Sequence, residues 1–251
     1  MMVFFFPLLF FFGLFIGSFL GVISDRVPNN ESIVLPPSHC DSCKKKLRWY
    51  DNIPLLSYVL LKGKCRFCGN KISFYYPAVE LTTALLFVVI GISTQNITEL
   101  IFNLYISASL IVIFFSDLKY EIIPSSVVYP AIVITFLFKI FFVNLTLFPP
   151  IASALGAFLF FLSLFLITKG RGMGFGDVQL AFLMGLFLGF PKILVSLYVA
   201  FLTGGMLSLI LVLWGKKKLR GSTLPFGPFL VFGTFFALFF GNVLWNRFFG
   251  V

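Results

Sequence analysis

The sequence contains few charged residues, because Asp, Glu, Lys and Arg together make up only 11% of its 251 positions. Hydrophobic residues account for 59%, and phenylalanine alone occurs 37 times. A chain so poor in charge is too apolar for a soluble domain. It also has no internal repeat, and no low-complexity linker beyond the Phe and Leu bias of its apolar segments. The composition therefore predicts a membrane protein.

The long apolar runs predict how often the chain crosses the membrane. A helix needs about 20 apolar residues to span the hydrocarbon core. We therefore expect an all-α polytopic membrane protein with about eight transmembrane helices, at roughly 3–23, 77–95, 98–117, 126–144, 148–168, 177–190, 192–214 and 225–246. Only Pro191-Lys192 separates the sixth segment from the seventh. The first segment lacks a basic leader and a small-residue cleavage site, so we expect a retained helix rather than a signal peptide.

The basic residues predict the orientation of these helices. With both termini outside, the loops 24–76, 117–125, 169–177 and 215–224 lie inside, and they hold every Lys and Arg except Lys139, Lys192 and Arg247. By the positive-inside rule these loops are cytoplasmic. The net charge of +10 requires no nucleic-acid partner, since basic loops beside anionic lipid account for it. The expected location is the cytoplasmic (inner) membrane, with the lipid bilayer as a partner.

The only long polar segment, 24–76, contains all four cysteines of the chain: Cys40, Cys43, Cys65 and Cys68. A two-residue gap within each pair lets a tight turn direct two sulfurs at one ion, and four thiolates complete a tetrahedral zinc shell. Gly69 follows the second pair, where such a turn needs a positive φ. The sequence therefore predicts a small cytoplasmic zinc-binding domain inserted after the first helix.

The cysteines also allow other interpretations. Two disulfides are the simplest alternative, but a reducing cytoplasmic loop favours thiols that bind metal. A redox relay is the main rival, and it would favour cysteines on the oxidising side. His39 adjoins Cys40, so it is either a substitute ligand or a flanking polar residue.

Two aspartates occupy positions where a membrane makes a carboxylate costly. Asp117 ends the apolar run 101–116, and Asp177 follows a glycine-rich turn and opens the run 178–190. An ionisable group at such a position costs roughly 2.5–3.5 kcal/mol on insertion scales. The topology places both on the cytoplasmic side, where paired carboxylates can share a proton and divide acid and base roles. This predicts the catalytic pair of an aspartic peptidase.

Each carboxylate also has a structural interpretation. Asp117 could be a solvated helix end, and Asp177 could be the N-cap of the following helix. We interpret Glu80 as a helix cap rather than a catalytic residue. The prolines of 224–230 suit the first turn of a helix, so that segment alone gives no reason to expect a site.

Several segments, in order, resemble the prepilin peptidases, or type IV leader peptidases, over nearly the whole chain. The matching segments are GSFL at 17–20, DNIPLLSY at 51–58, KIS at 71–73, YPAVE at 76–80, Asp117 with Ile123-Pro124, GFGD at 174–177 and LPFGPFL at 224–230. The resemblance implies three parts: a first transmembrane helix at 1–23, a four-cysteine zinc-binding domain at 24–76 and a transmembrane aspartic peptidase core at 77–251.

The resemblance also implies an activity. Such enzymes cut the leader from type IV prepilins or pseudopilins at the cytoplasmic face, and many methylate the new N-terminal amine with S-adenosylmethionine. The resemblance identifies Asp117 and Asp177 as catalytic, gives zinc a structural role, and leaves the methyl-donor site unknown. Three residues depart from the family pattern: Gly21 replaces a frequent asparagine, Ser125 a frequent aspartate and Gln179 a frequent lysine. These departures bear on methylation more than on cleavage.

Three rival functions have distinct consequences. In a non-enzymatic membrane assembly factor, neither aspartate would matter for processing. A membrane thiol oxidoreductase would have redox-active cysteines and no tightly bound zinc. A GxGD-type intramembrane peptidase would use the same aspartate chemistry on another substrate.

Overall fold

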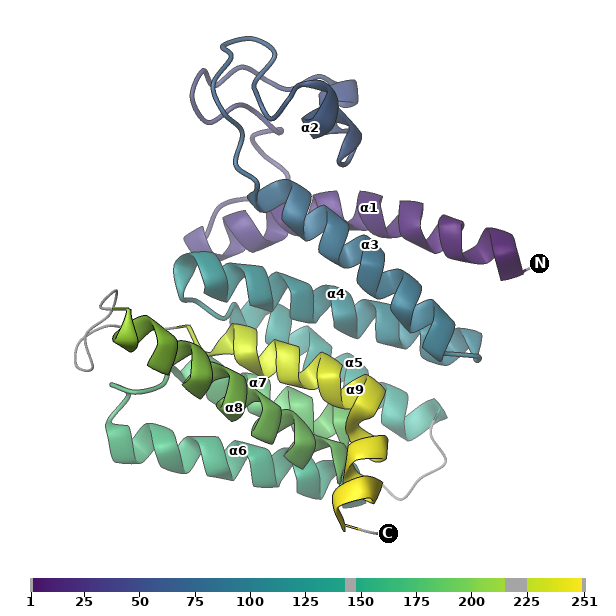
Figure 1. Ribbon diagram of the computed structural model, residues 1–251, viewed down its shortest axis with the longest axis vertical. Coiled ribbons are helices and arrows are strands. Elements are labelled where there is room, and N and C mark those ends of the chain that lie inside the picture. The colour runs from purple at the N-terminus through teal and green to yellow at the C-terminus, as the bar shows by residue number, and fades with distance from the viewer. Residues whose placement is uncertain (1, 143–147, 215–224, 250–251) are drawn as a thin grey trace. The chain divides into compact units, whose positions relative to one another are not determined.

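The computed structural model describes residues 2–142, 148–214 and 225–249, and this part of the chain is helical apart from its loops. The chain divides into two compact units, Met1–Phe115 and Ser116–Val251. The first unit contains α1 (Met2–Arg26), α3 (Tyr75–Ser93) and most of α4 (Ile97–Tyr120). The second contains α5 (Ser125–Phe142), α6 (Phe148–Thr168), α7 (Phe175–Leu188), α8 (Lys192–Leu213) and α9 (Gly227–Phe249) (Figure 1).

Within the described residues, seven helices are long and apolar enough to cross a membrane, which makes the protein a multi-pass membrane protein. They correspond to seven of the eight predicted spans. The remaining one, predicted at 177–190, forms α7, which has only 14 residues. At 1.5 Å per residue α7 is about 21 Å long, shorter than the roughly 30 Å of a hydrocarbon core. The count of eight spans therefore stays a prediction.

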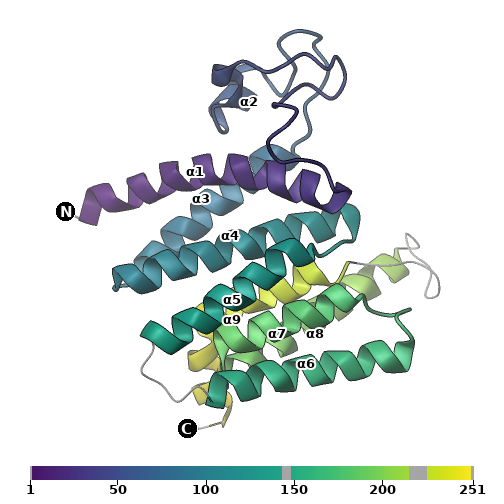
Figure 2. The same ribbon diagram turned by 180° about the vertical axis from the view of Figure 1, so that it is seen from behind.

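The α7 helix lies inside its unit. Ten of its residues are buried, and it packs against α5, α6, α8 and α9 (Figure 2). Gly189 ends the helix with a φ of +68°, and Pro191 then precedes α8. A helix covered on several sides by longer helices need not match the bilayer thickness by itself.

In the first unit, α1 and α3 pack through small residues. Gly13, Gly17 and Gly21 recur every four residues along α1. A Cβ at Gly13 would lie 2.6 Å from the Cα of Ala84, and a Cβ at Gly17 would lie 2.7 Å from the Cα of Glu80. Only glycine permits such a close backbone approach, which is a common way to join helices in lipid.

The segment 27–74 joins α1 to α3 with little regular structure. It contains two short 3-10 helices, Val27–Asn29 and Trp49–Asn52, and one short helix, α2 (Leu56–Leu60). The predicted cysteine domain, 24–76, lies wholly within the first unit. The predicted basic loop 215–224 and the end of the predicted span 126–144 lie outside the described residues.

Candidate functional site

Asp117 is buried in the last turn of α4, and its carboxylate is held by a residue distant in sequence. The backbone N–H of Gly227 donates a hydrogen bond of 2.9 Å to Oδ2 of Asp117. Gly227 is the first residue of α9, so its N–H is one of those that a helix leaves without an internal acceptor. The start of a helix also carries partial positive charge, which favours a carboxylate there. Asp117 is therefore an anchored side chain rather than a solvated helix end.

Asp177 is buried in the first turn of α7. Its Oδ2 accepts a hydrogen bond of 3.1 Å from the backbone N–H of Gly174. Gly174 is the N-cap residue and Asp177 the third residue of the helix, so the alternative in which Asp177 is itself the N-cap is wrong. The other oxygen, Oδ1, is buried and has no hydrogen-bond partner among the described residues. An unpaired buried oxygen at this site is available to bind water or a substrate group.

The structure brings the two predicted aspartates together around Ile123. A Cβ placed on Gly176, next to Asp177, would lie 2.8 Å from the Cβ of Ile123. A Cβ placed on Gly227 would lie 3.2 Å from Cδ1 of the same isoleucine. The two carboxylates are also close enough to repel each other electrostatically. The result is a buried carboxylate pair at the ends of α4, α7 and α9.

Gly227 is the functional residue that the sequence reasoning missed. The 224–230 segment gave no reason to expect a site, although it was among the segments that resembled the family. Its role is visible only in the fold, because Gly227 lies 110 residues after Asp117. Leu224 lies outside the described residues.

Two of the three departures from the family pattern contact each other beside the carboxylate pair. The hydroxyl of Ser125 donates a hydrogen bond of 3.0 Å to Oε1 of Gln179. The amide nitrogen of Gln179 donates a second one, of 2.7 Å, to the hydroxyl of Tyr129. Where the resemblance leads us to expect an aspartate and a lysine, this chain has a neutral hydrogen-bonded pair. The third departure, Gly21, leaves room for Tyr76, whose Cδ1 would lie 3.3 Å from an added Cβ.

The four predicted cysteine ligands form one cluster, with all four sulfurs within 4.8 Å of one another. The sulfurs of Cys40 and Cys68, one from each pair, are 3.8 Å apart. A tetrahedral ion with metal–sulfur distances of about 2.3 Å requires sulfur–sulfur distances of about 3.8 Å. A disulfide requires about 2.05 Å. The geometry therefore fits a metal ion better than disulfide pairing.

The two cysteine pairs have the same backbone conformation. Each first cysteine donates its N–H to a carbonyl five residues later, Cys40 to Lys45 at 3.0 Å and Cys65 to Asn70 at 2.8 Å. The residue after the second cysteine has a positive φ in both turns, +71° at Gly69 and +55° at Lys44. The expectation for Gly69 is confirmed. The two turns hold the sulfurs of one pair opposite those of the other.

The protein environment makes the thiols unequal. A hydrogen bond from the backbone N–H of Cys43 lowers the pKa of Cys40 to about 6. The backbone N–H of Asn70 favours a thiolate at Cys68, but desolvation and hydrogen bonds with the other three cysteines raise the pKa of Cys68 to about 11. A bound cation would favour ionisation of all four thiols. His39 lies outside this cluster, and its Nδ1 is 3.0 Å from the carbonyl of Pro37.

Glu80 has a different role from the predicted helix cap. It lies in the second turn of α3, and its Oε2 accepts a hydrogen bond of 2.8 Å from the backbone N–H of Leu55. Leu55 has φ +56° and ψ −45°, and the residues on either side of it, Pro54 and Leu56, are hydrogen-bonded through their main chains. This is a γ-turn, a strained conformation. Glu80 therefore ties a strained turn of the loop to α3.

These observations define a multi-pass membrane protein with a buried carboxylate pair and a separate cluster of four thiols that could bind a metal. Two family models match the chain: the bacterial peptidase A24 N-terminal domain over residues 11–94, and the type IV leader peptidase family over residues 104–209. The chain belongs to the type IV leader peptidase family.

Curated relatives agree with this assignment. A prepilin leader peptidase/N-methyltransferase of Bacillus subtilis is 34% identical over 94% of this chain and 94% of the relative. Proteins with the same name from Aeromonas salmonicida and Pseudomonas putida are 30% and 27% identical, over 95% and 93% of the chain and 91% and 90% of the relatives. No solved structure shows a significant match to the chain.

Proposed function

We propose that this protein is a membrane aspartic endopeptidase that removes the leader peptide of type IV prepilins or pseudopilins and then methylates the new N-terminus. The observation that carries the proposal is the carboxylate pair. Asp117 and Asp177 are buried together, each is oriented by a backbone N–H, and Oδ1 of Asp177 has no hydrogen-bond partner among the described residues. The name shared by the relatives supplies the substrate class.

The chemistry follows from a pair that shares one proton. The ionised carboxylate takes a proton from a water molecule, which attacks the scissile carbonyl. The protonated carboxyl donates a hydrogen bond to that carbonyl oxygen and later helps to protonate the leaving amine. Two carboxylates that share a proton titrate as a pair rather than one by one. Gly227 and Gly174 orient the pair with main-chain donors, so their geometry is fixed before the substrate binds.

The contacts at the carboxylate pair support a topology in which both aspartates lie on the same side of the membrane. The C-terminal end of α4 and the N-terminal ends of α7 and α9 meet there. In the proposed topology α8, which precedes α9 in the chain, starts on the opposite side, and α7 crosses the membrane despite its length. Eight crossings with both termini outside then result. The positive-inside rule assigns the side with the pair to the cytoplasm.

The cysteine cluster is the proposed site of a structural zinc ion. Cys40, Cys43, Cys65 and Cys68 would supply four thiolates, a closed set of soft ligands that suits zinc. Lys44, Lys45, Lys46, Lys64 and Arg66 lie beside them in sequence and would offset the net charge of −2. Zinc would cross-link a segment that contains little regular structure. It takes no part in peptide cleavage in this proposal.

Methylation requires a donor, and the proposed donor is S-adenosylmethionine. When bound, it supplies a methyl group whose bond to sulfur breaks as a bond to the neutral amine nitrogen forms, leaving S-adenosylhomocysteine and releasing one proton. The protein must hold the amine in line with that methyl group. Cleavage is therefore expected without the donor. Adding the donor is expected to increase the mass of the mature product by one methyl group.

The test is cleavage of a cognate prepilin by the purified full-length protein, with mass spectrometry of both products. Asp117→Asn and Asp177→Asn are each expected to abolish cleavage while the protein stays folded and membrane-inserted. Glu99→Gln is the matched control, because Glu99 is an exposed acid in the first turn of the same helix as Asp117. Normal cleavage by either folded aspartate variant would refute the catalytic pair.

A further inference from the structure

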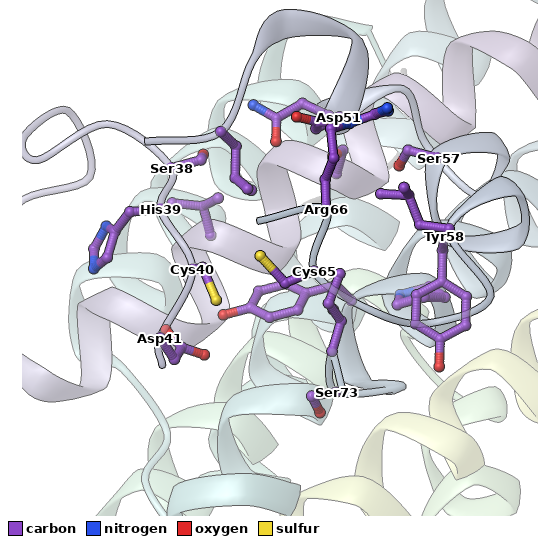
Figure 3. A pocket seen from close by; sticks show the side chains of 18 of the residues that line it. Ser38, His39, Cys40, Asp41, Asp51, Ser57, Tyr58, Cys65, Arg66 and Ser73 are labelled. Carbon is purple, nitrogen blue, oxygen red and sulfur yellow. The ribbon is translucent and has the colours of Figure 1, made fainter. Parts of the chain in front are cut away.

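The first unit contains a cavity of about 360 Å³ between α1, α3 and the cysteine-containing segment 27–74. This volume lies within the roughly 300–1,000 Å³ typical of small-molecule sites. Ser57, Tyr58, Cys65 and Ser73 are among the residues that line it (Figure 3). All lining residues fall between positions 18 and 80, so neither aspartate of the carboxylate pair lines this cavity.

A buried carboxylate forms part of the wall. Glu80 is only 7% exposed, and it hydrogen-bonds the backbone of Leu55 and the hydroxyl of Ser18. Among the described residues no salt bridge involves Glu80. A buried charge without a countercharge is costly, so the cavity favours a ligand that brings positive charge to this wall. By contrast, Asp51, the other buried acid of the wall, already pairs with Arg66 at 2.8 Å.

The rest of the wall suits a nucleoside with an amino-acid tail. Phe19, Tyr58 and Tyr76 offer aromatic surface for a planar base, and aromatic rings also attract a cation. Ser57 and Ser73 offer hydroxyl groups for polar contacts. Exposed Lys71 also lines the cavity and can pair with a carboxylate.

We propose that this cavity binds the methyl donor, a nucleoside sulfonium amino acid, and that the Glu80 carboxylate faces the sulfonium charge. This inference rests on the proposed methyltransferase activity and assigns that activity a binding site. It also gives Glu80 a second role besides holding the turn at Leu55. The departing product is uncharged at sulfur, so loss of the attraction to Glu80 would favour its release.

The test is equilibrium dialysis of zinc-loaded, full-length protein in detergent with labelled S-adenosylmethionine or S-adenosylhomocysteine. Glu80→Gln keeps an oxygen that can accept the Leu55 N–H but removes the charge. It is expected to weaken binding of the sulfonium ligand about tenfold and of the uncharged product less than about threefold. Because both ligands are measured on one preparation, their affinity ratio does not depend on the fraction of folded protein.

A cavity-filling variant tests the location independently. Ser57→Phe places a ring in the cavity and is expected to weaken both ligands at least about tenfold. Val59→Phe is the matched control, because Val59 is on the same short helix, is exposed and does not line the cavity. It is expected to bind both ligands like the wild type.

The outcomes separate this inference from the proposed function. If wild-type protein methylates a cleaved prepilin but Glu80→Gln leaves the affinity ratio unchanged, or Ser57→Phe binds like the wild type, the cavity assignment is overturned and the enzyme remains. An equal loss in Ser57→Phe and Val59→Phe overturns it as well. If wild-type protein neither cleaves nor methylates nor binds the donor, both the proposed function and the cavity assignment fail.

Discussion

The contact between Gly227 and Asp117 predicts that adding a single methyl group will inactivate the peptidase. In Gly227→Ala the new Cβ would lie 2.6 Å from Oδ2 and 3.0 Å from Cγ of Asp117. Contacts to a carbon atom are normally about 3.5 Å, so the carboxylate must move by nearly 1 Å. That movement lengthens its hydrogen bond to the Gly227 N–H, now 2.9 Å.

The expected loss of activity is large. A misplacement of about 1 Å costs about 100-fold in rate, and weakening a hydrogen bond to a charged group costs about 1.5–3 kcal/mol. We therefore expect cleavage to slow about 100-fold through kcat, with little change in KM. The assay is steady-state cleavage of a prepilin in detergent, alongside a thermal melt to establish folding.

Gly205→Ala in α8 is the matched control, because an added Cβ there meets no atom within 4 Å. It is expected to cleave at the wild-type rate. A folded Gly227→Ala protein with normal kcat would show that the Asp117 position is not required, and would refute the reasoning.

Three further perturbations probe other parts of the structure. Cys40→Ser is expected to reduce zinc from about one ion per chain and to impair methylation more than cleavage, measured by metal analysis and product mass spectrometry; unchanged zinc content would contradict this. Gln179→Lys is expected to destabilise the protein by about 3 kcal/mol because Gln179 is buried, and adding Ser125→Asp is expected to recover most of this loss as a charged pair, measured by melting temperature; a double variant no more stable than Gln179→Lys would contradict the pairing. Gly17→Leu is expected to destabilise the contact between α1 and α3 by about 1–3 kcal/mol, and an unchanged melting temperature would contradict that packing.

The aspartate pair and the cysteine cluster could be predicted from the sequence because each follows from the residues at or near those positions. The cost of a carboxylate near lipid and the placement of both aspartates on one side were enough to expect the pair of Asp117 and Asp177. The spacing within each cysteine pair likewise predicted that the sulfurs could converge on one ion, and the four cysteines do form a cluster. The stripe of Gly13, Gly17 and Gly21 was visible as a repeat of four but was not recognised as a packing surface.

Features that depend on distant contacts could not be predicted in this way. The residues next to Glu80 in the sequence suggest a helix cap, whereas its partner in the fold is the main chain of Leu55, 25 residues away. The burial of α7 among neighbouring helices depends on such contacts, and hydropathy alone does not show which helices are neighbours. The paired replacement at Ser125 and Gln179 becomes understandable only once their side chains are seen to touch.

The glycines around the carboxylate pair differ in how much space each leaves for a side chain. Gly174 and Gly227 both donate main-chain N–H groups, which any residue except proline would also supply. A Cβ on Gly174 would lie 3.6 Å from Oδ2 of Asp177, an ordinary contact, and its φ of −76° suits alanine. A Cβ on Gly176 would lie 2.8 Å from the Cβ of Ile123 and would push that side chain into the pair.

Gly174→Ala is therefore expected to retain cleavage within about threefold, with the modest loss of stability usual for alanine at an N-cap. Gly176→Ala is expected to lose activity about as strongly as Gly227→Ala, because it displaces Ile123, which lies against both glycines. Prepilin cleavage and melting temperature measured on the two variants test this order. The opposite order would mean that the first glycine of the motif is needed for close approach of the substrate rather than for the geometry of the pair.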